Sequence, residues 1–185
     1  EEGGLTELGY EYHKKTFSLG LTSYYSLIQN WIQWLPFHGG YWKPQNIKEV
    51  ESYGVEFNGS KKIKLKPLTI EVKGSYNLVF SKNRKSVIVD DVSVGKQLIY
   101  VPRNSANLLM KVGYRSAFLS YQQNYRGAAF IDVANTVYMP YFMPATLSLG
   151  WKVSNKTAKN RLEVIASIVN LYGEEYQVIA NRPMP

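Results

Sequence analysis

Alternation of apolar and polar residues with a period of two dominates this chain. Successive side chains of a β-strand point to opposite faces, so the alternation predicts strands with one apolar and one polar face. The pattern recurs in eight runs, at residues 6–13, 17–22, 52–58, 68–77, 106–113, 117–126, 146–153 and 162–168. No segment shows the spacing of an amphipathic helix. The sequence therefore predicts an all-β, antiparallel fold.

The connections between the runs alternate in length. Short polar turns join the first run to the second, the third to the fourth, the fifth to the sixth and the seventh to the eighth. The other connections are long and cover residues 25–49, 81–103 and 127–144. Hairpins with long loops at one end only are typical of transmembrane β-barrels, which have short periplasmic turns and long extracellular loops.

A soluble β-sandwich produces the same alternation, because its apolar face forms a buried core. Three features favour the barrel: runs of about ten residues, a polar face rich in Glu, Lys, Gln, Asn and Gly, and Tyr or Trp near the strand ends. The aromatic residues in question are Tyr10, Tyr12, Tyr25, Tyr76, Tyr114, Tyr125 and Trp151. The alternative is a soluble or surface-attached β-sandwich that binds a carbohydrate or a protein through aromatic loops.

The net charge of +8 raises the question of nucleic-acid binding. Lys and Arg gather at the expected turns instead of forming a basic helical stripe, which indicates solvation or contact with lipid head groups. These residues are Lys14, Lys15, Lys61, Lys62, Lys64, Lys66, Lys82, Arg84, Lys85, Lys156, Lys159 and Arg161. We therefore expect no nucleic-acid partner. The acidic N-terminus lacks an apolar signal region, so a membrane origin would mean that the chain begins inside a longer precursor.

Residues that could carry catalysis or bind a metal are sparse. Cysteine is absent, and the two histidines, His13 and His38, lie on different expected elements without a carboxylate at ligand spacing. Asp90 and Asp91 could contribute to a Ca²⁺ site only with further oxygen ligands, and we interpret them as a solvated loop tip. No glycine-rich phosphate loop precedes a helix. The sequence predicts a protein that is not an enzyme and holds neither a cofactor nor a metal.

Three motifs resemble TonB-dependent outer-membrane receptors. Residues 170–176 (Asn-Leu-Tyr-Gly-Glu-Glu-Tyr) and 181–185 (Asn-Arg-Pro-Met-Pro) resemble the closing signature of these barrels. Residues 51–56 resemble a recurrent x-x-x-Gly-x-Glu strand, and residues 95–104 resemble a loop in which a Pro-Arg pair precedes a strand. The resemblance is closest to cobalamin and siderophore receptors of the Bacteroidetes type.

This resemblance implies a bacterial outer-membrane location and a barrel of about 22 strands. The chain would supply roughly strands fourteen to twenty-one, residues 1–185 being an incomplete C-terminal part without the plug domain and the final strand. It implies TonB-dependent uptake of a scarce nutrient such as cobalamin, a siderophore or a haem-like ligand. The implied partners are outer-membrane lipid, the remainder of the barrel, the plug and, through the plug, TonB. A surface lipoprotein is left open.

Two sets of residues are candidates for binding. Aromatic residues of the long connections could stack on a flat ligand or grip a partner, or they could pack on each other and stiffen the loops. These are Trp31, Trp34, Tyr41 and Trp42, with Phe37, in the first connection and Tyr138, Tyr141 and Phe142 in the third. Charged residues expected on the polar face could form salt bridges to a plug or balance one another. These are Glu56, Glu71, Lys73 and Arg126.

Overall fold

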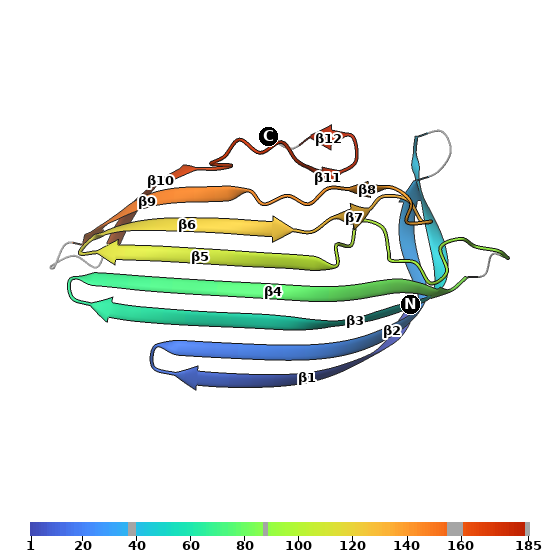
Figure 1. The fold of residues 1–185 in the computed structure, drawn as a ribbon, viewed down its shortest axis with the longest axis horizontal. Coiled ribbons are helices and arrows are strands. Elements are labelled where there is room, and N and C mark those ends of the chain that lie inside the picture. Colours follow the sequence, from blue (N-terminus) through green and yellow to red (C-terminus); the bar gives the residue numbers. More distant parts are fainter. Residues whose placement is uncertain (37–39, 87–88, 155–160, 184–185) are drawn as a thin grey trace.

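Eight antiparallel strands form one continuous sheet in the order β1-β2-β3-β4-β5-β6-β9-β10 (Figure 1). The computed structural model describes residues 1–36, 40–86, 89–154 and 161–183. The strands of the sheet are β1 (Glu2–Lys14), β2 (Phe17–Pro36), β3 (Trp42–Leu65), β4 (Leu68–Lys85), β5 (Asn104–Tyr114), β6 (Ala117–Arg126), β9 (Ala145–Ser154) and β10 (Arg161–Ile168). All eight predicted runs are strands, and the all-β prediction is confirmed.

Short hairpin turns lie at one end of the sheet, here called the short-turn end, and the long connections lie at the other, the long-loop end (Figure 1). Two small two-stranded sheets lie outside the main sheet. One pairs β7 (Ala129–Phe130) with β8 (Tyr138–Met139) in the connection from β6 to β9, and the other pairs β11 (Gln177–Ile179) with β12 (Arg182–Pro183) after β10. None of the described segments is a helix long and apolar enough to cross a membrane.

The prediction of a long loop over residues 25–49 is wrong. Strands β2 and β3 pair past the ends of their neighbours β1 and β4, from Trp31 opposite Ile47 to Pro36 opposite Trp42. Asn30, which has a φ of 56°, lies where the ladder skips one position before it resumes. Aromatic and β-branched residues favour extended strands, so this segment completes a long hairpin. The sequence around His38 and Phe37 lies outside the described residues.

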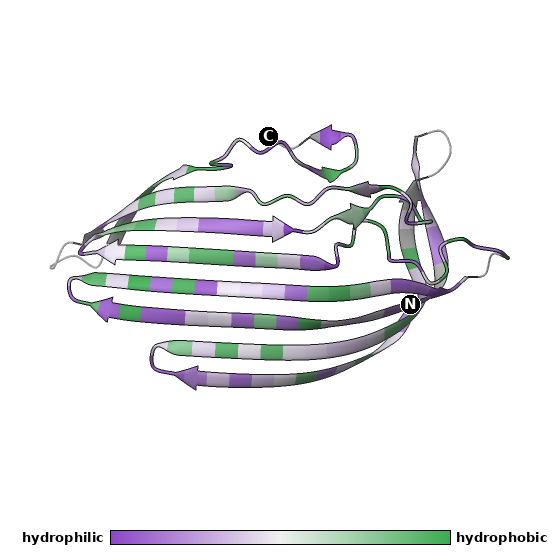
Figure 2. Ribbon diagram, viewed as in Figure 1, coloured by the Kyte–Doolittle hydropathy of each residue, from purple (hydrophilic) through white to green (hydrophobic). Residues whose placement is uncertain are grey.

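The strand register gives the sheet two chemically different faces. Leu21 lies opposite Phe57, and Leu119 lies opposite Leu149, on what we call the apolar face. Thr22 lies opposite Glu56 on the other, polar face. The two sets alternate along nearly every strand (Figure 2).

The apolar face is uncovered within the described part of the chain. Leu8 is 76% exposed and Leu149 is 59% exposed, although both belong to the main sheet. A sandwich would pack a second sheet on this face and bury such residues. The single sheet therefore favours a barrel wall whose apolar face meets lipid over the sandwich alternative.

Candidate functional site

The polar face carries all four charged residues that the sequence identified. Glu56 lies opposite Asn77, Glu71 lies opposite Lys111, and Arg126 lies opposite Ser105. Lys73 follows Glu71 at the next position of the same face, and its ammonium lies 2.8 Å from the Glu71 carboxylate. Register thus places the four side chains on one surface, but a plug-facing role stays a prediction.

Three of these residues are already engaged within the wall. Glu71 and Lys73 neutralise each other, and Lys62 and Lys111 flank Glu71 on the neighbouring strands. The Arg126 guanidinium donates a hydrogen bond to the backbone carbonyl of Tyr100 at 2.8 Å. Arg126 therefore anchors the connection between β4 and β5, while its remaining N–H groups can still reach another partner.

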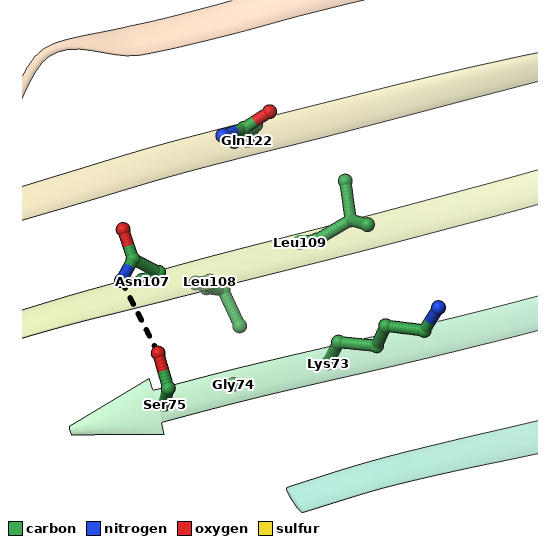
Figure 3. Close-up of a pocket in the computed structure, with 7 residues that line it drawn as sticks. All are labelled: Lys73, Gly74, Ser75, Asn107, Leu108, Leu109 and Gln122. Carbon is green, nitrogen blue, oxygen red and sulfur yellow. Dashed lines mark hydrogen bonds between the residues drawn. The ribbon is translucent and has the colours of Figure 1, made fainter. Parts of the chain in front are cut away.

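A hollow of about 210 Å³ lies beside Lys73 in the middle of the polar face (Figure 3). Its side-chain walls come from three strands. They are formed by Lys73, Ser75, Asn107, Leu109 and Gln122. The Asn107 amide donates to the Ser75 hydroxyl at 3.2 Å and fixes one wall. The hollow offers an ammonium, amides and one apolar side chain to whatever fills the barrel interior.

Phe118 is an aromatic residue of the polar face that the alternation pattern did not reveal. Its ring is 7% exposed and covers Gly150 on the neighbouring strand. The Lys111 ammonium lies 3.5 Å from the ring centroid, and that of Lys152 lies 5.8 Å away. Gly150 is the signal that could have indicated this contact, because a glycine opposite an aromatic residue leaves room for the ring.

The two connections from β4 to β5 and from β6 to β9 are held together by hydrogen bonds. The Asn135 side chain accepts the Gln97 N–H at 2.8 Å and donates to the Gln97 carbonyl at 3.0 Å. The Tyr100 N–H donates to the Phe130 carbonyl at 2.8 Å. Gln97 is buried, and its side-chain oxygen accepts the Ser81 N–H. These contacts, none of them expected from the sequence, fix the two loops to each other.

Asp132 stabilises the second of these loops. Its carboxylate accepts hydrogen bonds from the Val137 N–H at 2.7 Å, the Thr136 N–H at 2.9 Å and the Thr136 hydroxyl at 2.8 Å. Partial burial by itself would raise the pKa of Asp132, but these hydrogen bonds outweigh it and hold the pKa below its ordinary value. The ionised carboxylate thus closes the loop before β8.

The aromatic residues at the far end of the β2–β3 hairpin do not form one cluster. Trp31 packs against the small core of Val50 and Leu98. Trp42 lies 5.7 Å from the Tyr100 ring, centroid to centroid. Trp34 is 60% exposed, and Tyr41 is exposed as well. The structure therefore spreads these residues over separate surfaces, and their contact with a ligand stays a prediction.

The aromatic residues of the third connection do meet in one place. Tyr138, Tyr141 and Phe142 line a pocket of about 330 Å³ together with Tyr176. The Phe142 and Tyr176 rings stack at 4.6 Å with an interplanar angle of 22°. The Tyr141 ring lies 6.0 Å from that of Tyr125. Tyr176 belongs to a motif noted for its family resemblance, and nothing in its local sequence pointed to this pocket.

A single antiparallel sheet with an uncovered apolar face, a polar opposite face and long loops at one end is the wall of a membrane β-barrel. Residues 5–171 match the family of TonB dependent receptor-like β-barrels, and the chain belongs to this family. The predicted resemblance is thus confirmed. Members of this family are outer-membrane proteins, which places the chain in the bacterial outer membrane. No curated protein sequence matches it.

Solved structures of two receptors and one iron transporter share this fold. The ferric preacinetobactin receptor of Acinetobacter baumannii is 16% identical with a TM-score of 0.70, over 94% of this chain and 26% of that one. The ferric yersiniabactin uptake receptor of Yersinia pestis is 19% identical with a TM-score of 0.69, over 96% and 26%. The FrpB iron transporter of Neisseria meningitidis is 13% identical with a TM-score of 0.66, over 98% and 29%. The chain thus spans roughly a quarter of the length of these structures.

Proposed function

We propose that the complete receptor takes up a scarce nutrient through the outer membrane by TonB-dependent transport, and that this chain supplies barrel wall and extracellular loops. The family match over residues 5–171 carries this proposal. The remainder of the barrel and a plug domain would belong to other parts of the receptor. Transport of this kind needs binding and gating but no covalent chemistry in the wall.

We infer that the substrate is a ferric siderophore or another flat ligand, such as haem or cobalamin. The three similar structures are named for ferric ligands or iron. The pocket of about 330 Å³ falls within the range of small-molecule sites. The stacked rings of Phe142 and Tyr176 offer an aromatic surface to such a ligand.

The pocket is held in shape before any ligand arrives. The Glu174 carboxylate accepts the Met143 N–H at 2.9 Å, which ties the segment carrying Tyr176 to the segment carrying Phe142. The Asn170 amide donates to the Glu174 carbonyl and accepts the Glu174 N–H, each at 3.0 Å. A fixed pocket loses little conformational entropy when it binds, which favours affinity.

Substitution of Tyr176 in the complete receptor tests this proposal. Binding of ferric siderophores, haem and cyanocobalamin, each offered separately, would be measured by calorimetry. Tyr176→Ala should weaken binding of the accepted ligand by about tenfold, the effect of losing an aromatic contact of about 1.4 kcal/mol. Tyr172→Ala is the matched control, because the Tyr172 hydroxyl contacts Tyr121 on the apolar face instead. Unchanged affinity in Tyr176→Ala would contradict the pocket assignment.

We also propose that the polar face docks the plug around Glu56, Glu71 and Lys73. The hollow beside Lys73 supports this proposal, because an ammonium and two side-chain amides line it on the polar face. The chain has no cysteine, so a cysteine introduced here is the only thiol in this part of the receptor. Lys73→Cys, treated with a short thiol-to-amine crosslinker, should couple to the plug, whereas Met110→Cys on the apolar face should not. Equal coupling from both positions would contradict plug docking at Lys73.

A further inference from the structure

The polar face carries a row of lysines that leads from the middle of the sheet to its short-turn end. The lysines lie at four successive levels of the strand register, each two residues beyond the last. They are Lys73 on β4, Lys62 on β3 with Lys111 on β5, Lys64 on β3, and Lys152 on β9. Two residues of an extended strand span about 7 Å, so the row covers about 20 Å. We call these lysines the lysine track.

Positive charge predominates along the lysine track. Glu71 pairs with Lys73 at 2.8 Å, and Glu163 lies opposite Lys152. Glu11, on β1, lies one level farther from the short-turn end than Lys73. Among the described residues of the paired strands, five lysines therefore face two carboxylates from the level of Lys73 to the short-turn end. Neighbouring levels lie about 7 Å apart, within the Debye length of about 8 Å, so their charges act together on an anion.

The Phe118 ring holds two ammonium groups of the track in place. Its centroid lies 3.5 Å from the Lys111 ammonium and 5.8 Å from that of Lys152. The ring itself is fixed, because it is buried over Gly150. A cation–π contact restrains an ammonium without neutralising its charge, as a carboxylate would. Both lysines therefore keep a positive charge that an anion can contact.

The upper end of the track leads to the aromatic pocket. The hollow beside Lys73 adds the amides of Asn107 and Gln122 as hydrogen-bond donors (Figure 3). Arg126 lies on the same face, about 14 Å farther toward the long-loop end. Its N–H donates to the Phe142 carbonyl at 2.9 Å, and the Phe142 N–H donates to the Arg126 carbonyl at 3.0 Å. Because Phe142 lines the pocket, cations mark a path from the pocket to the short-turn end.

Cations spaced in this way suit an anion that moves stepwise, because each site binds it weakly enough to pass it to the next. We propose that the lysine track conducts an anionic iron chelate from the aromatic pocket to the periplasm. The proposal rests on the proposed uptake function and narrows its substrate to an anion. Anionic oxygens of the chelate accept hydrogen bonds from Lys73, then from Lys111 and finally from Lys152, once the plug has moved away from this face.

Uptake by cells that express the complete receptor tests the proposal with probes of different charge. Radiolabelled haem and a ferric tris-catecholate are the anionic probes, and a ferric trihydroxamate and cyanocobalamin are the neutral ones. Wild type should take up an anionic probe. Lys62→Gln combined with Lys64→Gln should lower the uptake rate at saturating probe by about tenfold, because two charges of the track are lost. The affinity for the probe should not change, because both lysines lie far from the pocket.

Lys61→Gln is the matched control. Lys61 precedes Lys62 on β3 but lies on the apolar face, opposite Val72. Its loss should leave the uptake rate at the wild-type value. Lys62→Arg combined with Lys64→Arg keeps both charges and should restore most of the rate that the glutamine variant loses. Heat-modifiable migration on gels would verify that each variant forms a folded barrel.

Several outcomes would overturn the proposal. The double glutamine variant could keep the wild-type rate, Lys61→Gln could lower the rate equally, or wild type could take up only neutral probes. Coupling of Lys73→Cys to the plug could also fall together with uptake in the double glutamine variant, which would show that these lysines hold the plug instead. Wild type that takes up no probe would contradict the proposed function itself, whereas uptake that ignores the lysines would contradict only the track.

Discussion

Substitution of Gly150 by alanine should destabilise the barrel when Phe118 is present and stabilise it when Phe118 is replaced by alanine. A Cβ atom added at Gly150 would lie 2.1 Å from the nearest atom of the Phe118 ring, too close for any real contact. The ring would have to move and would lose its position under the Lys111 ammonium. Overpacking costs about 1–3 kcal/mol, and loss of the cation–π contact adds about 0.5–1 kcal/mol. Gly150→Ala should therefore destabilise the barrel.

The same substitution should stabilise a barrel that lacks the ring. In a Phe118→Ala background the added methyl group has free space. A strand alanine is then more stable than glycine by about 0.5–1 kcal/mol, because glycine loses more backbone entropy on folding. Urea unfolding of the complete receptor in lipid vesicles, followed by tryptophan fluorescence, would give the four free energies of this double-mutant cycle.

Gly113→Ala is the matched control for this experiment. Gly113 lies directly opposite Phe118 on the same face, but a Cβ there meets only backbone oxygens at 3.9 Å. This variant should be neutral or slightly stabilising. An equal penalty for Gly150→Ala with and without the Phe118 ring would refute the reasoning, since the cost could then not come from the ring.

Three further predictions concern the membrane face and the loops. Leu108→Arg places a charge on the apolar face and should destabilise the barrel in vesicles by about 2–4 kcal/mol. Leu109→Arg places the same charge on the polar face and should cost less than about 1 kcal/mol. Equal costs for the two variants would contradict the assignment of the faces. Asn135 has a φ of 59°, a left-handed conformation that glycine also adopts, so Asn135→Gly removes only the side-chain bonds to Gln97. Exchange of the Gln97 amide hydrogen should then accelerate by about tenfold. An unchanged rate would contradict the loop contact. Because the pKa of Asp132 is lowered in the folded loop, its carboxylate stabilises the loop above pH about 4, and this stabilisation is lost as the pH falls through the lowered pKa. Amide hydrogen exchange in the loop should therefore accelerate at low pH in the wild type relative to Asp132→Asn. Identical pH profiles for the two proteins would contradict this prediction.

Much of the fold could be predicted because a period-two pattern reports directly on strand faces. Leu19 and Leu21 identify the apolar face of β2 without knowledge of any neighbour, and Glu71 and Lys73 identify the polar face of β4 in the same way. The pattern failed between residues 25 and 49, where apolar and polar residues do not alternate regularly. The extended β2–β3 hairpin there depends on cross-strand pairing, which only the register shows.

The candidate pocket depended on contacts that local sequence cannot report. Phe142 and Tyr176 are far apart along the chain, and they stack because the segment after β10 folds back beside the segment before β9. The bond between Asn135 and Gln97 likewise joins two separate loops. The many aromatic residues in the long connections made them candidates for ligand binding, but the sequence did not predict which rings share a pocket.

The sequence by itself determined most of the strands and their two faces, because alternation is a local property of the chain, and its loop lengths and family motifs favoured the membrane-barrel class over a sandwich. The tertiary structure alone decided that Phe118 covers Gly150, that Tyr176 joins the loop pocket, and that Asn135 bonds to Gln97. Each of these relations depends on strand register or loop packing. Register brings together residues that are distant in sequence, so no local pattern encodes it.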